Sequence, residues 1–276
     1  MSTKVFSLLV ATGLLLGWAA SSAAMDISGW TCTGNCGSSG ADGVVTLSST
    51  PGTVSYGWVS TNGSSATNPG LTPASIDATA GTSTTNGSKI QSPLFSANGG
   101  DTLSFHFNYV TSDGSTSYTD YAWARLLDSL GNEVAMLFAA RTTPAGNTVP
   151  GYNMPPPVAT LVPAAAPIIP GAPSWAPLGS DSGSCYTGGG CGYTGWVDVT
   201  YAIPTTGSYR LEFGVVNWGD SAYASGLAFD GILVGGNPPQ PRATTEPIPA
   251  NNVIGMAMMI LLVAGLGAAG RFRRRC

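Results

Sequence analysis

The chain has little charge, and its charge is mostly of one sign. Only 9% of its 276 residues are charged. Between Met25 and Ala250, all fourteen acidic residues stand against five basic ones, which gives a formal charge of −9. This balance argues against binding of nucleic acid or anionic lipid by that span, because both partners are polyanions. It suits solubility outside the cell or the binding of a divalent cation.

The sequence also lacks a recognisable catalytic constellation. A Ser-His-Asp hydrolase would need the single histidine, His106, but the alternation of its segment places His106 on the polar face of a strand, and no GxSxG elbow occurs. Nothing pairs the sparse carboxylates as a glycosidase requires, and no phosphate-binding loop or dinucleotide fingerprint appears. A non-enzymatic protein is therefore the leading prediction. An exported hydrolase and a purely structural matrix protein remain alternatives.

Both ends of the chain read as targeting segments. Residues 1–24 combine Lys4, an apolar run and the small residues Ser22-Ala23-Ala24, the pattern of a cleaved secretory signal peptide. At the other end, a Pro-rich linker over 237–252 precedes an apolar segment over 253–270, which is long enough for one transmembrane helix. A basic tail over 271–276 contains Arg271, Arg273, Arg274 and Arg275 and is predicted to stay in the cytoplasm.

Four cysteines lie in the span between these segments. Cys32 and Cys36 are close neighbours, as are Cys185 and Cys191. In an exported domain, four cysteines indicate two disulfides, and the short spacings favour the two local pairs among three connectivities. A zinc site is disfavoured because neither pair is CxxC and the only histidine lies in a strand.

The stretch from Asp101 to Arg141 predicts three consecutive β-strands. Leu103, Phe105, Phe107 and Tyr109 alternate with polar residues, which is the period of a strand with one buried face. A second strand centred on Trp123, with Trp123 in the core, and a third over 134–140 follow. Three adjacent apolar strands require an opposing layer.

The remaining strands are expected over residues 43–48, 53–60, 89–95, 195–203, 207–218 and 226–234. Residues 61–88 read as a polar loop. Residues 142–179 contain ten prolines and read as a long loop that covers a sheet edge. We therefore predict that residues 25–236 form an all-β, two-sheet antiparallel sandwich of jelly-roll type.

Two kinds of ligand are compatible with this ectodomain. Acidic residues at or near turns and in the last strand could hold a structural calcium ion; they are Asp113, Asp120, Asp220 and Asp230. Asp230 has the alternative role of a buried partner of Arg125 or of backbone amides. Loop aromatics could stack on sugar rings, with burial in the core as the alternative; the candidates are Trp175, Tyr186 and Tyr193.

The C-terminal signals resemble those of the bacterial PEP-CTERM proteins and their IPTL-CTERM relatives. The motif is Glu246-Pro247-Ile248-Pro249, followed by the apolar segment and the arginine cluster. The resemblance implies export, temporary anchoring in the inner membrane, cleavage near the motif by an exosortase-like protease-transpeptidase, and delivery to the cell surface or exopolysaccharide matrix. A permanent single-span anchor is the alternative.

The ectodomain carries a second, more diffuse resemblance. Its "SPLF…GDTLSFHF" and "GLAFDGILV" segments are similar to edge and closing strands of jelly-roll carbohydrate-binding modules. The stretch from FHFNYVTSDG to GYNMP also resembles an uncharacterised ectodomain family found with such sorting signals. Together these resemblances imply a surface protein associated with extracellular polysaccharide.

Overall fold

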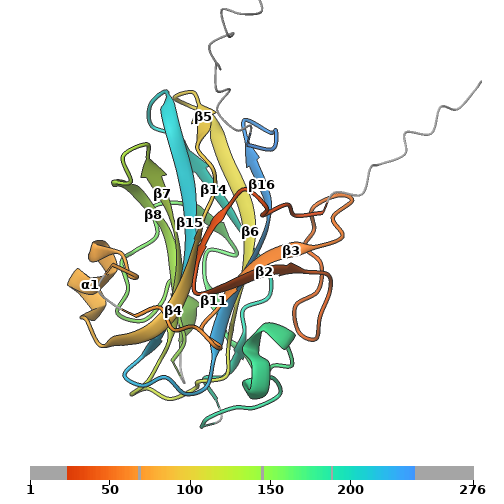
Figure 1. The fold of residues 1–276 in the computed structure, drawn as a ribbon, viewed down its shortest axis with the longest axis vertical. Coiled ribbons are helices and arrows are strands. Elements are labelled where there is room, and N and C mark those ends of the chain that lie inside the picture. Colours follow the sequence, from red (N-terminus) through yellow and green to blue (C-terminus); the bar gives the residue numbers. More distant parts are fainter. Residues whose placement is uncertain (1–23, 68–69, 144–145, 188, 240–276) are drawn as a thin grey trace, which may run out of the picture. The chain divides into compact units, whose positions relative to one another are not determined.

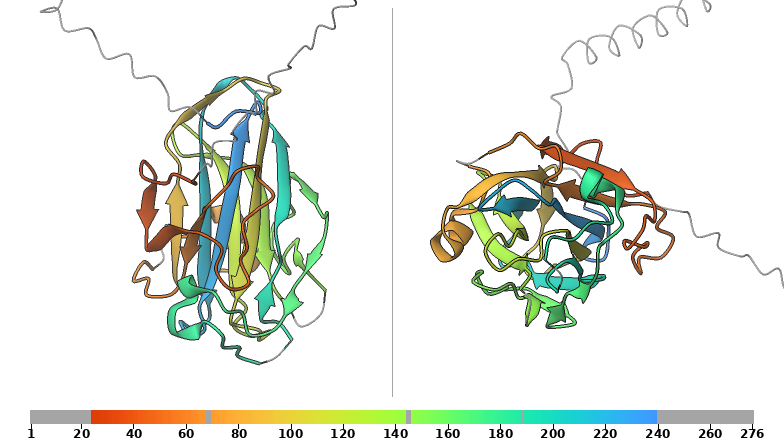
Figure 2. Two further views of the ribbon diagram at one scale, coloured as in Figure 1. Left: turned by 90° about the vertical axis from the view of Figure 1, so that its right-hand side faces the viewer. Right: turned by 90° about the horizontal axis from the view of Figure 1, so that it is seen from below.

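The computed structural model describes residues 24–67, 70–143, 146–187 and 189–239. These residues form two antiparallel sheets packed face to face, which confirms the predicted all-β sandwich (Figures 1 and 2). The signal peptide apart from Ala24, the linker beyond Pro239, the apolar segment over 253–270 and the basic tail lie outside the described residues. Within the described part of the chain, no helix has the length and apolarity needed to cross a membrane.

The first sheet has six strands, with β5 paired to β15 beside the main path. In spatial order the path is β1 (Thr31–Thr33), β4 (Thr84–Gln91), β15 (Gly207–Trp218), β7 (Tyr121–Asp128) and β8 (Glu133–Arg141), and β5 is Phe95–Ala97. The central strand β15 pairs with both β4 and β7 over most of its length.

The second sheet has eight strands and is built around β6 and β16. Its path is β10 (Thr160–Val162), β14 (Val197–Ala202), β6 (Thr102–Thr111), β16 (Ser225–Val234), β3 (Tyr56–Ser60) and β2 (Asn35–Ser39), with β12 (Ile169–Pro170) and β13 (Gly192–Tyr193) joined beside β6. A separate pair consists of β9 (Asn147–Val149) and β11 (Ala166–Pro167).

The core lies between the two sheets and follows the predicted alternation. Phe105 of β6 packs against Phe213 of β15, and Phe107 of β6 stacks on Phe138 of β8. All four rings are buried. Phe213 also stacks on Phe229 of β16, with ring centroids 4.2 Å apart. Apolar side chains at every second position therefore meet across the sandwich, because successive residues of a strand point to opposite faces.

The three strands predicted between 101 and 141 are consecutive in the chain, but only β7 and β8 are adjacent in space. Strand β6 belongs to the second sheet, whereas β7 and β8 belong to the first. The loop over 112–120 crosses from one sheet to the other. The expectation of three adjacent strands was therefore wrong, although the buried face of β6 was predicted correctly.

Three local predictions also need correction. Residues 43–48 form no strand, because Val44 donates its N–H to the Ser174 carbonyl and Asp42 bonds to the backbone of Ala176 instead. The expected polar loop over 61–88 contains helix α1 (Ala74–Ala80) and the start of β4. The strand expected over 89–95 is split between β4 and β5.

Two segments cover the first sheet. Ile76 of α1 packs on the outer face against Tyr121 and Trp123, and Trp123 is fully buried as predicted. The proline-rich segment covers the free edge of β8, since Gly151 and Val158 donate backbone hydrogen bonds to Ala139 and Met136. This second contact confirms that the segment covers an edge strand.

The N-terminal hairpin connects the two sheets at one side of the sandwich. Strand β1 extends the first sheet and β2 extends the second. The disulfide between Cys32 of β1 and Cys36 of β2 joins them, as the spacing predicted. Trp30, just before β1, stacks on Phe213 and Phe229 of the core. The hairpin therefore closes the open side of the interior.

Candidate functional site

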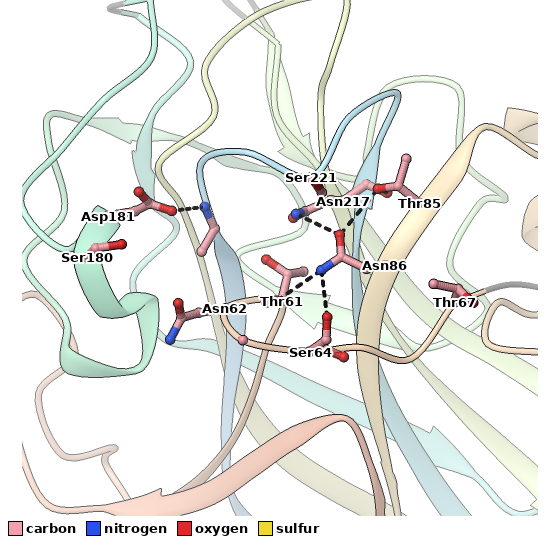
Figure 3. Close-up of a pocket in the computed structure, with 12 residues that line it drawn as sticks. Thr61, Asn62, Ser64, Thr67, Thr85, Asn86, Ser180, Asp181, Asn217 and Ser221 are labelled. Atoms are coloured by element: carbon pink, nitrogen blue, oxygen red, sulfur yellow. Dashed lines mark hydrogen bonds between the residues drawn. The ribbon is translucent and has the colours of Figure 1, made fainter.

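A polar pocket of about 600 Å³ lies at one end of the sandwich, where β3 and β15 end and β4 and β16 begin (Figure 3). Ten of its twelve lining residues carry a polar side chain, so it is hydrophilic rather than a gap in the core. The polar residues are Thr61, Asn62, Ser64, Thr67, Thr85, Asn86, Ser180, Asp181, Asn217 and Ser221.

Asn86 holds the floor of this pocket together. Its amide nitrogen donates to the backbone oxygens of Thr61 and Ser64 at 3.2 and 3.1 Å. Its oxygen accepts a hydrogen bond from the Asn217 amide nitrogen at 3.1 Å. Because these three bonds use both ends of the amide, Asn86 fixes the positions of its neighbours and has little capacity left for a ligand.

Asn217 is the opposite case. Asn217 lies at the end of β15 and is only 2% exposed. Its side-chain Oδ1 has no hydrogen-bond partner among the described residues. The neighbouring hydrogen bonds determine the orientation of the Asn217 amide. Asn86 presents its oxygen to Asn217, so the Asn217 group that faces it must be the donating nitrogen. A buried acceptor without a donor is costly, and a ligand or water that donates a hydrogen bond removes that cost.

Four further groups around the pocket have hydrogen-bonding capacity to spare. The side chains of Asn62, Ser180 and Ser221 make no hydrogen bond to any described residue, and only one carboxylate oxygen of Asp181 is used, by the Ala224 N–H at 2.8 Å. These groups come from three different loops. Together they offer a mixture of donors and acceptors around the pocket (Figure 3).

The short helix η1 (Ala176–Asp181) positions Ser180 and Asp181. It is held by Trp175, whose indole N–H donates to the Tyr56 hydroxyl at 2.9 Å. Trp175 is fully buried and its ring lies against Gly226, so the prediction that this residue stacks on a sugar is wrong. The Trp175 ring packs beside β16 instead of facing solvent.

Two tyrosine rings lie beside the pocket. Tyr186 and Tyr223 stack on each other with ring centroids 5.0 Å apart, and Tyr186 is 38% exposed. Tyr223 adopts a left-handed backbone conformation with φ of 57°, directly before the pocket residue Ala224. The disulfide between Cys185 and Cys191, also as predicted, fixes the loop of Tyr186. Tyr193 is half-buried against the cluster around Trp175.

Three of the four proposed calcium ligands lie near one another at this end. Burial raises the pKa of Asp113 to about 6, and Asp220 adds to the increase by charge repulsion. Burial also holds the pKa of Asp120 well above its ordinary value, and Asp113 and Asp220 repel it as well. Asp120 nevertheless has partners, since it accepts hydrogen bonds from Ser225 Oγ at 2.6 Å and from the Trp218 N–H at 2.9 Å.

No group of three or more His, Cys, Asp or Glu side chains that could hold a metal ion occurs among the residues the structure describes. Asp230 lies farther along β16 and accepts a hydrogen bond from Ser48 Oγ at 2.5 Å. It is buried as expected, but the expected pairing with Arg125 is wrong, because Arg125 bonds to Glu212 and Glu133.

His106 has a partner that its sequence position did not reveal. Its Nδ1 lies 2.7 Å from Asp198 Oδ1, across the register between β6 and β14. The pair lies in a second hollow, of about 350 Å³, with Thr50 and Gly231 on its other side. The carboxylate orients the imidazole, which is half of a general-base arrangement, but no described nucleophile is hydrogen-bonded to the ring.

The sequence did not single out the residues of the polar pocket. Asn62, Asn86 and Asn217 are ordinary loop and strand-end residues in a Ser/Thr/Asn-rich chain, and Asp181 stands alone among glycines and serines. The one available signal was Asn217 itself, a polar residue at an inward position directly after Leu211, Phe213 and Val215. A buried polar position of this kind indicates either an internal network or a site.

The chain matches no model of a known protein family and no curated protein sequence. Among solved structures, it is similar to the enzymatically active domain of tailspike protein 4 of bacteriophage CBA120, with a TM-score of 0.32 and 15% identity over 76% of this chain and 20% of that chain. It is similar to an arabinose-bound MgGH51 α-L-arabinofuranosidase, with a TM-score of 0.30 and 8% identity over 75% of this chain and 23% of the other. The alginate lyase of a Corynebacterium species gives a TM-score of 0.30 and 13% identity over 75% of this chain and 94% of that chain. TM-scores this low carry no argument about function.

Proposed function

We propose that this protein is an exported surface protein whose jelly-roll-like β-sandwich binds extracellular polysaccharide in the polar pocket, without turning it over. The observation that carries the proposal is the set of polar side chains around the pocket with spare hydrogen-bonding capacity, those of Asn62, Ser180, Asp181 and Ser221. A sugar hydroxyl can donate to the unused Asp181 oxygen, and its own oxygen can in turn accept from Asn62, Ser180 or Ser221.

The aromatic pair beside the pocket supports the same class of ligand. Sugar rings have apolar faces that stack on aromatic side chains, and Tyr186 is exposed next to Tyr223. In the proposal Tyr186 therefore keeps the stacking role expected for it, Tyr223 joins it, and Trp175 is replaced. The volume of about 600 Å³ is within the range of small-ligand sites.

The cellular part of the proposal rests on the sequence and on the disulfides. The two disulfides of the domain suit an oxidising compartment outside the cytoplasm. In this proposal, the signal peptide directs export, the segment over 253–270 anchors the chain in the inner membrane, and an exosortase-like enzyme cleaves near Glu246-Pro247-Ile248-Pro249. The arginines at 271 and 273–275 keep the tail in the cytoplasm.

Binding of purified ectodomain to soluble glycans tests the proposal. In affinity electrophoresis, at least one polysaccharide should retard the wild-type domain, and Asn217→Ala together with Asn62→Ala should weaken that retardation about tenfold or more. Asn98→Ala is the matched control, because Asn98 is exposed in a turn at the other end of the sandwich. A wild-type domain that no glycan retards would favour the structural matrix protein instead.

An exported hydrolase is the second candidate, and the His106–Asp198 pair is the observation in its favour. A base oriented by a carboxylate can activate water or a hydroxyl group. This function requires turnover of a glycan or an ester by the wild-type domain and loss of turnover in His106→Asn. Turnover that survives this substitution would place the chemistry elsewhere.

A further inference from the structure

The charges around the polar pocket determine which polysaccharides fit it, and the argument rests on the proposed function. None of the described basic residues lines the pocket. Lys89 and Arg125 bond to the buried Glu212, and Arg141 is buried over the ring of Trp218. Arg210 lies on β15 with its Nε buried. The described domain therefore offers no cation to an anionic ligand at this site.

The acidic groups at the same end add a charge of the opposite sign. Asp181 lines the pocket itself. Asp220 follows β15 directly, and its backbone oxygen accepts a hydrogen bond from the pocket residue Thr85. A carboxylate or sulfate placed in this hollow would approach these charges in a partly desolvated space, where repulsion is stronger than in bulk water.

The hydrogen-bonding groups are compatible with the same class of ligand. The unused Asp181 oxygen is an acceptor, and the side chains of Asn62, Ser180 and Ser221 can donate or accept. A sugar hydroxyl can donate to the Asp181 oxygen and accept from a neighbouring side chain, whereas a carboxylate or sulfate group has no proton to donate to Asp181.

We infer that the polar pocket selects neutral, hydroxyl-rich glycans and rejects glycans that carry uronate or sulfate groups. An anionic group is disfavoured in such a site, because it meets the like charge of Asp181 and no described basic residue lines the pocket to offset the repulsion. Ser180 is the residue through which this selectivity can be altered, since it is exposed on the pocket rim and makes no hydrogen bond to a described residue.

The test compares neutral, acidic and cationic glycans in affinity electrophoresis with the wild-type ectodomain at two salt concentrations. A neutral glucan, mannan or xylan should retard it, and alginate, polygalacturonate and chondroitin sulfate should not. Chitosan is the cationic glycan. Ser180→Arg should gain affinity for an acidic glycan by about tenfold, as expected for one new charge-assisted contact. Ser96→Arg is the control, because it adds the same charge at an exposed position of β5 at the opposite end.

The outcomes separate this inference from the proposed function. Retardation by acidic but not neutral glycans, lost in Asn217→Ala, would overturn the inference and leave a carbohydrate-binding site. Retention on cationic chitosan alone, abolished by salt and unaffected by Asn217→Ala, would overturn it as well, because it would reflect net charge. No retardation by any glycan would remove the proposed function and the inference together.

Discussion

Glu212 of β15 and Arg125 of β7 face each other in register, with Oε1 and Nε 2.6 Å apart on the outer face of the first sheet. Gln91 donates to the other carboxylate oxygen at 2.7 Å, and Lys89 lies 3.7 Å from it. Burial alone would raise the pKa of Glu212, but the hydrogen bond and charge of Arg125, helped by Gln91 and Lys89, hold it below its ordinary value. The buried carboxylate is therefore ionised and fully paired.

Removing the charge of Glu212 should destabilise the domain. We expect Glu212→Gln to lower the free energy of unfolding by about 3 kcal/mol, because Arg125 then loses its main partner in a largely buried setting. Urea denaturation at pH 7 measures this. Glu133→Gln is the matched control, since Glu133 also pairs with Arg125 but at the more exposed rim, and its cost should stay below about 1 kcal/mol. Equal decreases in the free energy of unfolding for the two substitutions would contradict the larger role assigned to Glu212.

Protonation of Asp113, a buried acid near the pocket, should stabilise the fold, whereas protonation of Glu212 should destabilise it. The pKa of Asp113 is raised to about 6 in the folded state, so the folded protein binds this proton more tightly than the unfolded chain does. Stability should therefore rise as the pH falls from 7 towards 5, and it should fall again in stronger acid as Glu212 is protonated. Asp113→Asn should raise stability at pH 7.5 by about 1–2 kcal/mol and flatten this rise.

Calcium removal provides the control for that experiment. A cation among Asp113, Asp120 and Asp220 would relieve the same repulsion, so its loss on chelation would lower the melting temperature at neutral pH. We expect EDTA to leave the melting temperature unchanged, since the described residues do not converge on a metal position. A decrease that added calcium reverses would restore the calcium hypothesis.

The two disulfides should have separable effects. Replacing Cys32 and Cys36 by serine should lower stability by about 2 kcal/mol and leave glycan binding unchanged, because that bridge joins the edges of the two sheets and does not hold the loop of Tyr186. Replacing Cys185 and Cys191 should weaken glycan binding, because that bridge fixes the loop of Tyr186 beside the pocket. Denaturation and affinity electrophoresis of both variants distinguish a stabilising bridge from one that supports binding. Loss of glycan binding in the variant without the Cys32–Cys36 bridge would contradict this assignment.

The C-terminal sorting proposal predicts a shortened mature protein. Mass spectrometry of the surface protein should find a C-terminus near Glu246 to Ala250, without the segment that ends at Cys276. Glu246→Ala with Pro247→Ala should leave export intact and keep full-length protein in the inner membrane, because neither step uses the motif. Neutral substitutions at 273–275 should loosen orientation and serve as the comparison. Surface protein that retains Cys276 would identify a permanent anchor.

Strand faces could be predicted from this sequence, whereas strand partners could not. The alternation in β6 and β15 reflects a direct physical cause, since each strand buries one face in the same core. Sheet membership depends on which way the loop over 112–120 turns, and this is not encoded in local periodicity. The hairpin of β1 and β2 carries no alternation because its residues are mostly exposed Thr, Ser, Gly and Cys.

The pocket was harder to predict for a related reason. Asn86 and Asn217 are separated by 131 positions, and Asp181 comes from a third loop. Each resembles an ordinary solvated residue by itself, and only the fold brings them together. The disulfide pairs, by contrast, were predictable because close sequence spacing already limits the distance between two cysteines.

The direction of β16 has a consequence for how the protein would work on a surface. The strand starts beside the pocket at Ser225 and ends at Val234, about 30 Å farther along, on the side from which the chain continues to Pro239. The pocket therefore lies at the end of the domain opposite the start of the C-terminal linker. Under the proposed function, many copies held through their linkers would present their pockets to one polymer, and repeated sugar units would engage several of them at once. Avidity of this kind would make adhesion firmer than a single site allows.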